Sequence, residues 1–316
     1  MQFNMLAEGL SAPPSSPPPF PSPDNRPSEN GGFDQLAPAD LASLQFSDRR
    51  WRLLLEIVSH SPDLLSVQEM DHFPDFFLPA LSHFGYDGVF QPKQGSPCLS
   101  FGHHSDGVGV FWKRSLFSLA ADHSSPESDG VKVPCAAVSL SPVPGSPCPV
   151  KKELLFATVH LKAKMSQENE LLREKQVSAV LSRIFALPNA SSSCVIFNGD
   201  FNADSKPAPM KGEETLAPLA VQAVAAFDQL GSSYPLENSA IDTTSDPTKN
   251  WFWSTWKRRG DKESKHAIDY MYYTKRDFVP ATILLPPTNE DLGEGRLPSS
   301  RYPSDHISLV TEYAVI

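Results

Sequence analysis

The sequence predicts an α/β fold, a two-layer β-sandwich flanked by helices. Short apolar runs of β type recur along the chain, amphipathic segments with helical spacing lie between them, and 40% of the 316 residues are hydrophobic. Closely spaced strands with interspersed helices are typical of two packed sheets with helices outside. Because such a sandwich can absorb a chain of this length, we expect a single domain over residues 1–316.

The first predicted strand lies at residues 2–6, and a Pro/Ser-rich segment at 11–32 follows it. This segment has few apolar side chains to bury, so we expect a mobile insertion within the domain. A Pro-rich docking ligand is the alternative interpretation. The next predicted element is an amphipathic helix that begins at Ser47. Its expected apolar face is formed by Trp51, Leu54, Leu55 and Val58.

The remaining elements follow one another without an internal repeat. Predicted helices cover 73–84, 167–185 and 216–227. Predicted strands cover 64–68, 88–91, 108–112, 133–140, 153–160, 194–197, 267–273 and 307–315, and the stretch 122–149 is predicted as a hairpin with a loose tip.

Charge and cysteine content narrow the class of protein. The formal net charge of −10 argues against a broad basic surface for non-specific nucleic-acid binding. This net charge is compatible with a small anionic substrate held by a few local cations, or with carboxylates that surround a metal. No C-x-x-C spacing occurs, so the cysteines are expected to be buried free thiols in a reducing compartment: Cys98, Cys135, Cys148 and Cys194.

The chain contains neither a secretory signal nor an apolar stretch of the roughly 20 residues that span a bilayer. We therefore expect a soluble, cytoplasmic monomer. Residues 2–6 are typical of a strand interior. A longer natural chain with a targeting segment would therefore place the protein in an organelle, mitochondrion or plastid.

Two residues near predicted strands suit a metal centre. Glu69 follows the strand at 64–68, and Mg²⁺ takes oxygen ligands with one or two protein carboxylates. A solvated glutamate in a turn is the usual interpretation of an isolated carboxylate. Asn4 is unusual within a strand. A neutral oxygen supporting the metal or its water explains it, and so does a frayed terminus.

The strand at 194–197 leads into Asn198-Gly199-Asp200-Phe201-Asn202. Asp200 and Asn202 alternate and therefore point the same way. The carboxylate suits the orientation or deprotonation of an attacking water, and the amide suits donation to phosphoryl oxygens. Alone, the Asn-Gly-Asp sequence indicates only a hairpin turn.

Histidines end two further apolar segments. His160 is followed by Lys162 and Lys164, and one imidazole with two ammonium groups suits phosphate binding. A satisfied core histidine with two solvated lysines is the alternative. His306 needs a carboxylate to fix its tautomer. Asp269 or Asp305 can supply it, which leaves the other to face the metal.

Together these motifs resemble the endonuclease/exonuclease/phosphatase superfamily, which has a DNase I-like fold. The resemblance rests on Val67-Gln68-Glu69, Gly199-Asp200-Phe201-Asn202, Ile268-Asp269-Tyr270 and Ser304-Asp305-His306. Within its deadenylase-related branch, the chain is most similar to the nocturnin group. Five segments carry that similarity: Gln2-Phe3-Asn4-Met5-Leu6-Ala7, Phe90-Gln91-Pro92-Lys93, His160-Leu161-Lys162-Ala163, Thr255-Trp256-Lys257 and Tyr302-Pro303-Ser304-Asp305-His306.

The resemblance implies a role for each motif residue. The metal would be Mg²⁺, with Mn²⁺ as a substitute, held by Glu69 with Asp305 and Asn4 nearby. Asp200 would orient the nucleophilic water, and Asp269 would orient His306. Phosphate contacts are implied for Asn202, His160, Lys93, Lys162 and Lys164. Two departures from the expected pattern stand out: Lys164 replaces an arginine, and the loop at 101–106 carries His103 and His104.

The resemblance also implies the reaction, which is Mg²⁺-dependent removal of the 2′-phosphate of NADP(H) to give NAD(H). A 3′-to-5′ exoribonuclease acting on poly(A) is the second hypothesis. Such an enzyme needs a basic path with aromatic platforms for successive bases, and the acidic chain disfavours RNA as substrate. The third hypothesis is a non-catalytic adaptor on the same scaffold, against which the full set of motif residues argues. We therefore predict the dinucleotide as substrate.

Overall fold

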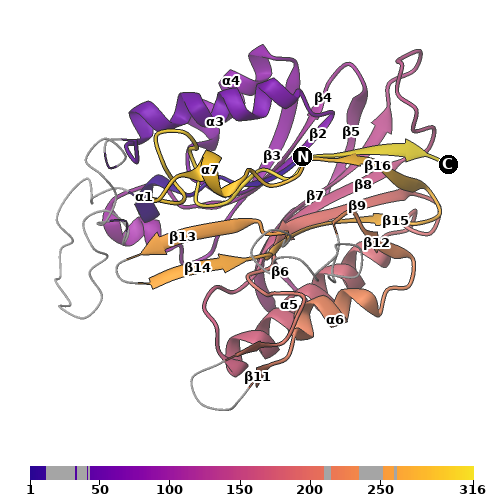
Figure 1. Ribbon diagram of the computed structural model, residues 1–316. Coiled ribbons are helices and arrows are strands. Elements are labelled where there is room, and N and C mark those ends of the chain that lie inside the picture. Colours follow the sequence, from indigo (N-terminus) through magenta and orange to yellow (C-terminus); the bar gives the residue numbers. More distant parts are fainter. Residues whose placement is uncertain (12–32, 34–40, 42, 210–214, 235–251, 260–261) are drawn as a thin grey trace.

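Two stacked β-sheets with helices on both outer faces form the body of the molecule (Figure 1). The structure, a computed structural model, describes residues 1–11, 33, 41, 43–209, 215–234, 252–259 and 262–316. The predicted α/β sandwich is confirmed. The Pro/Ser-rich segment predicted at 11–32 lies outside the described residues from residue 12 onward.

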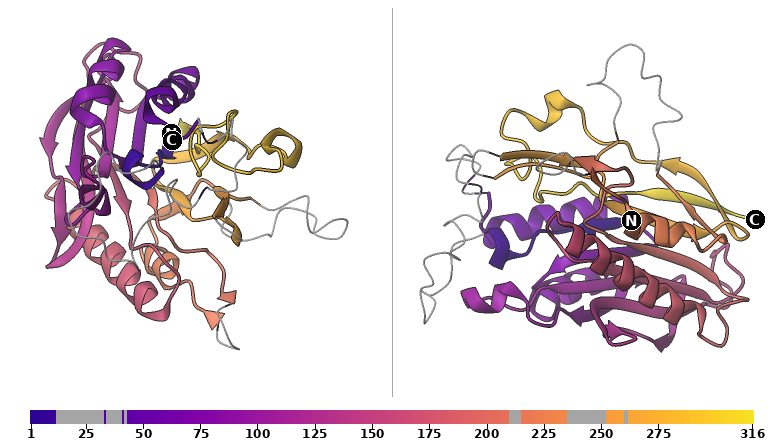
Figure 2. Two further views of the ribbon diagram at one scale, coloured as in Figure 1. Left: turned by 90° about the vertical axis from the view of Figure 1, so that its left-hand side faces the viewer. Right: turned by 90° about the horizontal axis from the view of Figure 1, so that it is seen from below.

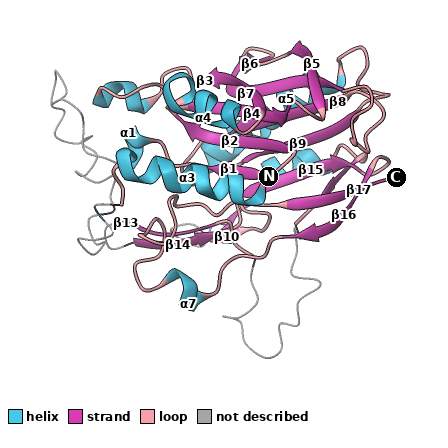
Figure 3. Cartoon of the chain, turned by 90° about the horizontal axis from the view of Figure 1, so that it is seen from above, coloured by secondary structure: helices cyan, strands magenta, loops and turns pink. Residues whose placement is uncertain are grey.

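The first sheet is 4-stranded and holds the N-terminus. Its order is β1 (Gln2–Asn4), β2 (Leu64–Met70), β4 (Gly107–Lys113) and β3 (Tyr86–Pro92). Strand β1 runs parallel to β2, and the other pairs are antiparallel. Its outer face is covered by α3 (Phe46–His60), the π-helix η1 (Phe73–Phe77) and α4 (Leu78–His83), as Figure 3 shows from above.

The second sheet is 7-stranded and carries the C-terminal motifs. Its order is β12 (Leu230–Ser232), β15 (Asp269–Thr274), β9 (Cys194–Asp200), β8 (Leu154–His160), β7 (Val131–Pro142) and β5 (Phe117–Asp122), with β6 (Ser125–Ser128) paired to β7. Strands β8 and β9 are parallel, and the other pairs are antiparallel. Helices α5 (Gln167–Phe185) and α6 (Leu219–Ala225) cover its outer face (Figure 2).

The core between the two sheets explains why the sequence shows continuous apolar runs. Trp112 from β4 packs with Phe156 from β8 and Ile196 from β9 in one buried cluster. Every residue of β8 and β9 is buried. A half-exposed strand alternates apolar and polar residues. A strand that is covered on both faces is apolar along its length, so it forms a continuous apolar segment in the sequence.

Several small elements escaped sequence prediction. They are the short helices α1 (Glu8–Ser11), η2 (Pro97–Phe101) and α7 (Asn289–Leu292), the two-stranded sheets β10 (Ala208–Pro209) with β11 (Thr215–Leu216) and β13 (Thr255–Arg259) with β14 (Lys262–His266), and strand β16 (Phe278–Ile283), which pairs with β17 (Thr311–Val315). The strand predicted at 307–315 is confirmed only at β17. Before it, His306 and Leu309 make isolated bridges to Thr255 and Gln2.

The predicted apolar face of α3 is confirmed at Leu54, which is buried, and at Val58, which packs against the same core, but not at Trp51 and Leu55. Trp51 and Leu55 are exposed, and the buried face is formed by Phe46, Arg49, Leu53, Leu54 and Ile57. Arg49 lies on that face because its guanidinium finds buried acceptors, including the carbonyl oxygen of Met5 at 2.7 Å. A prediction from apolar periodicity counts arginine as polar, so it leaves Arg49 off the buried face of α3.

All four cysteines are buried and free, as predicted. Within the described ranges, no helix combines the length and apolarity that crossing a membrane requires.

Candidate active site

Strand register places the polar motifs at one edge of the sandwich. In the second sheet His160 is the register partner of Asp200, and Asp200 is the partner of Asp269. Parallel β8 and β9 end at this edge, and antiparallel β15 begins there. In the first sheet, β1 and β2 also run parallel and bring Asn4 and Glu69 to the same place. Four strand ends and one strand beginning therefore converge.

The backbone of β2 is irregular at Glu69. Its φ is 52°, in the left-handed region, and the register against β4 shifts between Gln68 and Met70. A bulge re-aims the side chain that it carries, and a left-handed non-glycine residue holds backbone strain, typical of functional positions. The Glu69 carboxylate thereby meets groups of the second sheet.

Asn4 joins the two carboxylates of the site. Its side-chain amide donates to Glu69 Oε1 at 3.2 Å and to Asp200 Oδ2 at 2.9 Å, while its oxygen accepts from the backbone of Leu6. Asn4 is fully buried. The sequence suggested a side chain that supports the metal or its water, and in the structure Asn4 bridges the two carboxylates.

Asp200 lies at the centre of the group and is almost fully buried. Burial and the nearby charge of Asp269 raise the pKa of Asp200, although His306, Asn202 and Asn4 oppose that shift. The backbone N–H of Asn202 donates to Asp200 Oδ1 at 2.8 Å. A carboxylate whose pKa is raised toward neutrality is suited to accept a proton.

His306 is paired with Asp269, which decides the choice that the sequence left open. The Nδ1 atom lies 2.7 Å from Asp269 Oδ2, and both side chains are buried. Burial alone lowers the pKa of His306, but the charge and hydrogen bond of Asp269 outweigh it and raise the pKa to about 9. The imidazole is therefore cationic at neutral pH. Its Nε2 lies 3.9 Å from Asp200 Oδ2.

His160 is the opposite case. Burial and the charge of Lys93 lower its pKa, so the ring is neutral. Its Nε2 lies 3.6 Å from Asp200 Oδ2 and 3.8 Å from Glu69 Oε1, and these contacts are polar rather than ionic. Its Nδ1 is buried without a hydrogen-bond partner in the described part of the chain. The site therefore holds one cationic and one neutral imidazole.

Asn202 stands beside Asp200 with a φ of 51°. Its side-chain amide donates to the carbonyl oxygen of Leu161 at 3.2 Å, so one amide hydrogen is used and the second remains available.

Asp305 does not join this group. Its Oδ2 pairs with Lys257 Nζ at 2.7 Å and with Arg259 at 3.1 Å. Burial alone raises the pKa of Asp305, but the charges of Lys257, His306 and Arg259 hold it well below its usual range. The expected metal-side position is therefore replaced by an ion pair with β13.

The three predicted phosphate-binding lysines differ in position. Lys93 lies 3.7 Å from the buried carboxylate of Asp106, and its charge acts on His160, so it belongs to the site. Lys162 and Lys164 are exposed. Their backbone carbonyl oxygens accept from Arg173, which fixes this segment of the main chain rather than the ammonium groups.

A buried polar layer beneath the site was missed by sequence reasoning. Gln2 donates to Asp269 Oδ1 at 3.2 Å and to Gln68, and Gln68 donates to Thr158 at 2.7 Å. Ser304 donates to the carbonyl oxygen of Asn4 at 2.7 Å. Glutamines within apolar strand runs were the available signal, because buried amides need hydrogen-bond partners.

The donor chemistry of the group fits a hard divalent cation. Ligand atoms of Glu69, His160 and Asp200 lie within 4.8 Å of one another, and so do those of Asp200, Asp269 and His306. Three of these five residues are carboxylates, and burial together with the charge of Asp269 raises the pKa of Asp200. A cation near Glu69 and Asp200 would favour the charged carboxylates, and oxygen ligands suit Mg²⁺.

Comparison with known proteins shows what this chain is similar to. The sequence model of the Endonuclease/Exonuclease/phosphatase family matches residues 1–306. Nocturnin from Xenopus laevis is 31% identical over 320 residues, covering 99% of this chain and 71% of the frog protein. For human nocturnin the covered share is 64%, so the chain spans about two thirds of the length of these relatives. Carbon catabolite repressor protein 4 homolog 1 from Arabidopsis thaliana is 24% identical, covering 89% of this chain and 55% of that protein.

Among solved structures, the human Nocturnin catalytic domain with a bound sulfate anion superposes with a TM-score of 0.66 at 28% identity. The match covers 87% of this chain and 89% of that one.

Proposed function

We propose that this chain, which belongs to the Endonuclease/Exonuclease/phosphatase family and is a phosphoester hydrolase similar to nocturnin, removes the 2′-phosphate of NADP(H) in a Mg²⁺-dependent reaction. The main support for the proposal is that two pairs of side chains meet at one edge of the sandwich. Glu69 and Asp200 form a carboxylate pair joined by Asn4, and Asp269 holds a cationic His306 beside Asp200.

The protein groups divide the work of in-line phosphoryl transfer. Asp200, held by the backbone N–H of Asn202 and by Asn4, orients the attacking water and accepts its proton. His306, cationic and held by Asp269, donates from Nε2 to a phosphoryl oxygen. The second amide hydrogen of Asn202, for which no described residue is an acceptor, is a further donor for the phosphoryl group.

Glu69 would hold the cation, with Asp200 beside it. When bound, Mg²⁺ supplies neutralisation of the charge that develops on the phosphoryl and leaving oxygens. The strained bulge at Glu69 and the support from Asn4 fix the carboxylate before the ion arrives.

Two features favour a small, doubly anionic substrate. The net charge of −10 disfavours a long polyanion, while Lys93 beside His160 offers a local cation for a single phosphate. The similarity to nocturnin supports the 2′-phosphate of NADP(H) in particular.

A 3′-to-5′ exoribonuclease acting on poly(A) is the second candidate. The similarity to the carbon catabolite repressor 4 homolog supports it, because that protein lies in the deadenylase-related branch. The same catalytic groups serve either reaction, so the two functions differ only in what binds outside the reaction centre.

One experiment separates these functions. Purified protein with Mg²⁺ is offered NADPH, with phosphate release as the readout, and a 3′-end-labelled oligo(A), with product length as the readout. We expect phosphate from NADPH and an intact oligomer. Stepwise shortening of the oligomer without phosphate release from NADPH would favour the exoribonuclease. Silence on both substrates would favour the adaptor hypothesis.

Glu69→Ala is the control for the site. It should abolish turnover and leave the melting temperature within a few degrees, since Glu69 is only partly buried. Unchanged activity in this variant would overturn the assignment of the centre.

We also propose that residues 1–316 act as one domain. The support is that β1 pairs with β2 while Gln2 bridges Leu309 near the C-terminus, so both ends of the chain enter the same sandwich.

A further inference from the structure

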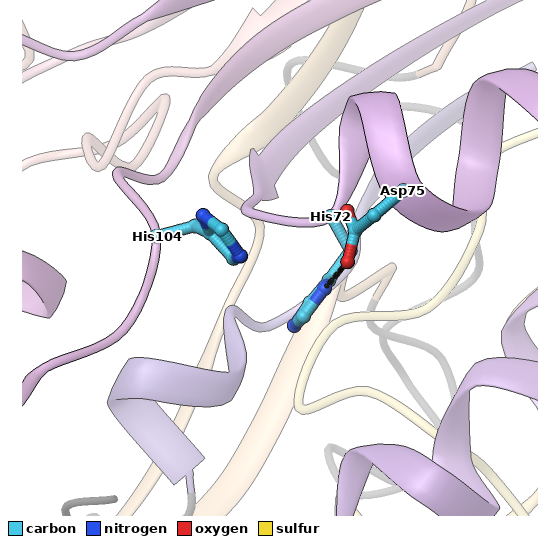
Figure 4. A group of neighbouring side chains, drawn as sticks. All are labelled: His72, Asp75 and His104. Atoms are coloured by element: carbon cyan, nitrogen blue, oxygen red, sulfur yellow. Dashed lines mark hydrogen bonds and ion pairs between the residues drawn. The ribbon is translucent and has the colours of Figure 1, made fainter.

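A second group of metal-capable side chains lies near the candidate active site and shares none of its residues. His72 follows β2, Asp75 lies in η1, and His104 lies in the loop after η2. Ligand atoms of these three residues lie within 4.8 Å of one another. Figure 4 shows the His104 ring facing the His72–Asp75 pair, with one ring nitrogen turned toward it.

His72 is held between two carboxylates. Its Nδ1 lies 2.7 Å from Asp75 Oδ2, and its Nε2 lies 2.9 Å from Glu8 Oε2. The His72 and His104 rings meet edge to face at 5.4 Å. A histidine that offers one nitrogen to a metal and donates the other N–H to a carboxylate is the common arrangement around protein-bound metals. Glu8 stands where that orienting carboxylate is required.

The surroundings fix the His72 ring in place. Phe46 stacks on it with ring centroids 3.8 Å apart and an angle of 13° between the planes. The side chain of His72 is only 12% exposed, whereas Asp75 is 48% exposed. A rigid imidazole next to an accessible carboxylate gives a preorganised site that an ion can reach from solvent.

A third histidine provides an independent observation. The His103 side chain is 8% exposed, its Nδ1 lies 3.6 Å from Glu8 Oε2, and its Nε2 is buried without a hydrogen-bond partner among the described residues. A buried polar atom of this kind calls for a ligand, an ion or a water. It lies in the loop whose two adjacent histidines depart from the expected pattern of the superfamily.

We propose that His72, Asp75 and His104 bind a divalent transition-metal ion of the zinc class, with Glu8 as the carboxylate that orients His72. Two imidazoles and one carboxylate form a ligand set that Zn²⁺ and Co²⁺ take readily, whereas Mg²⁺ prefers oxygen ligands alone. Ion binding replaces the hydrogen bond between His72 and Asp75 by two bonds to a shared metal, and the Nδ1 proton of His72 is released to solvent while its Nε2 proton stays on the hydrogen bond to Glu8. Three protein ligands leave at least one position open to water.

Co²⁺ is the probe, because its visible absorption reports ligand number and geometry. Titration is done with excess Mg²⁺ in the Glu69→Ala background, which removes the main ligand of the proposed catalytic centre. We expect one equivalent of Co²⁺ to bind, and Zn²⁺ to displace it. Zn²⁺ should also raise the melting temperature of this protein.

Substitutions locate the ion. His104→Ala and Asp75→Asn should each weaken Co²⁺ binding at least about 10-fold, the lower end of the range for altered metal surroundings. Both side chains are exposed, so the variants should fold. His83→Ala, in α4 and outside the cluster, is the matched control and should bind like the parent protein.

Absence of a bound equivalent in the Glu69→Ala protein would overturn the proposal. So would Co²⁺ affinity that His104→Ala and Asp75→Asn leave unchanged. Because the readouts are Co²⁺ absorption and melting temperature rather than turnover, neither outcome depends on the proposed phosphatase reaction.

Discussion

Replacement of Asp269 by asparagine tests the catalytic pair most directly. The two side chains are of equal size, and the asparagine would keep an oxygen for the amide of Gln2, which now donates to Asp269 Oδ1 at 3.2 Å. The new amide nitrogen would then face His306 Nδ1. The amide nitrogen of the asparagine donates a hydrogen bond, so His306 Nδ1 must accept it. His306 therefore lacks the Nδ1 proton and is neutral.

The size of the effect follows from two properties of the pair. The 2.7 Å bond joins two buried charged groups, and bonds to charged groups contribute about 1.5–3 kcal/mol, or roughly 10- to 150-fold in rate. The protonation state of His306 gives a similar lower limit for the loss of rate. The pKa of His306 is raised from 6.5 to about 9. If it returns to its ordinary value, about one tenth of the molecules stay cationic at about pH 7.5.

The pH dependence of activity follows from the direction of the pKa shift of His306. A raised pKa keeps His306 charged below about 9, so activity of the parent enzyme should be lost only as pH rises through that region. In Asp269→Asn the loss should begin near neutral pH. The assay is Mg²⁺-dependent phosphate release from NADPH, and kcat should fall while KM stays nearly constant, because the bond acts in the transition state.

Asp277→Asn is the matched control, since Asp277 is equally buried but lies away from the site and pairs with Lys152 and Thr274. It should lower the melting temperature and leave kcat unchanged. A kcat for Asp269→Asn within twofold of the parent enzyme, at an unchanged pH profile, would refute the role given to the pair.

Four further outcomes are expected. Lys93→Ala should raise KM for NADPH by about 10-fold, because a cation beside the phosphate is lost, and should also lower the melting temperature, because the buried carboxylate of Asp106 loses its ion-pair partner; equal KM values would contradict its role. Gly199→Ala should destabilise the fold by about 1–3 kcal/mol in urea unfolding, since the new Cβ would lie 2.6 Å from the carbonyl oxygen of Val159. Arg173→Leu should cost about 3–5 kcal/mol by the same measurement, because it leaves the buried carboxylate of Glu170 without its partner. Chelation with EDTA should abolish phosphate release, and added Mg²⁺ should restore it; full activity in EDTA would exclude a metal-dependent reaction.

The sequence predicted the sheet framework well, for a physical reason. Strands β8 and β9 are covered on both faces, so their residues are uniformly apolar until the strand ends. The polar residues that follow must then lie at the sheet edge. Glu69, His160 and Asp200 were found by that change from apolar to polar, without knowledge of the tertiary structure.

Other features depend on distance in space rather than on pattern. The pairing of His306 with Asp269 joins residues 37 positions apart: Asp269 begins β15, whereas His306 is placed by its bridge to Thr255 in β13. The face that α3 buries depends on acceptors for Arg49 from separate parts of the chain. The β13–β14 hairpin is rich in charged residues, and its strands form a two-stranded sheet with no apolar run to reveal it.

The adjacent residues Asp305 and His306 show how the fold resolves such ambiguity. The two side chains have different partners in space, so this Asp-His dipeptide does not direct both groups into one site. Two cations of strand β13, Lys257 and Arg259, bind the carboxylate of Asp305. Thr255 donates to the Asp305 carbonyl oxygen at 2.7 Å and bridges His306. His306 is thereby turned toward Asp269, and its position is set from both sides. The hairpin that the sequence did not reveal thus fixes the histidine that the sequence identified.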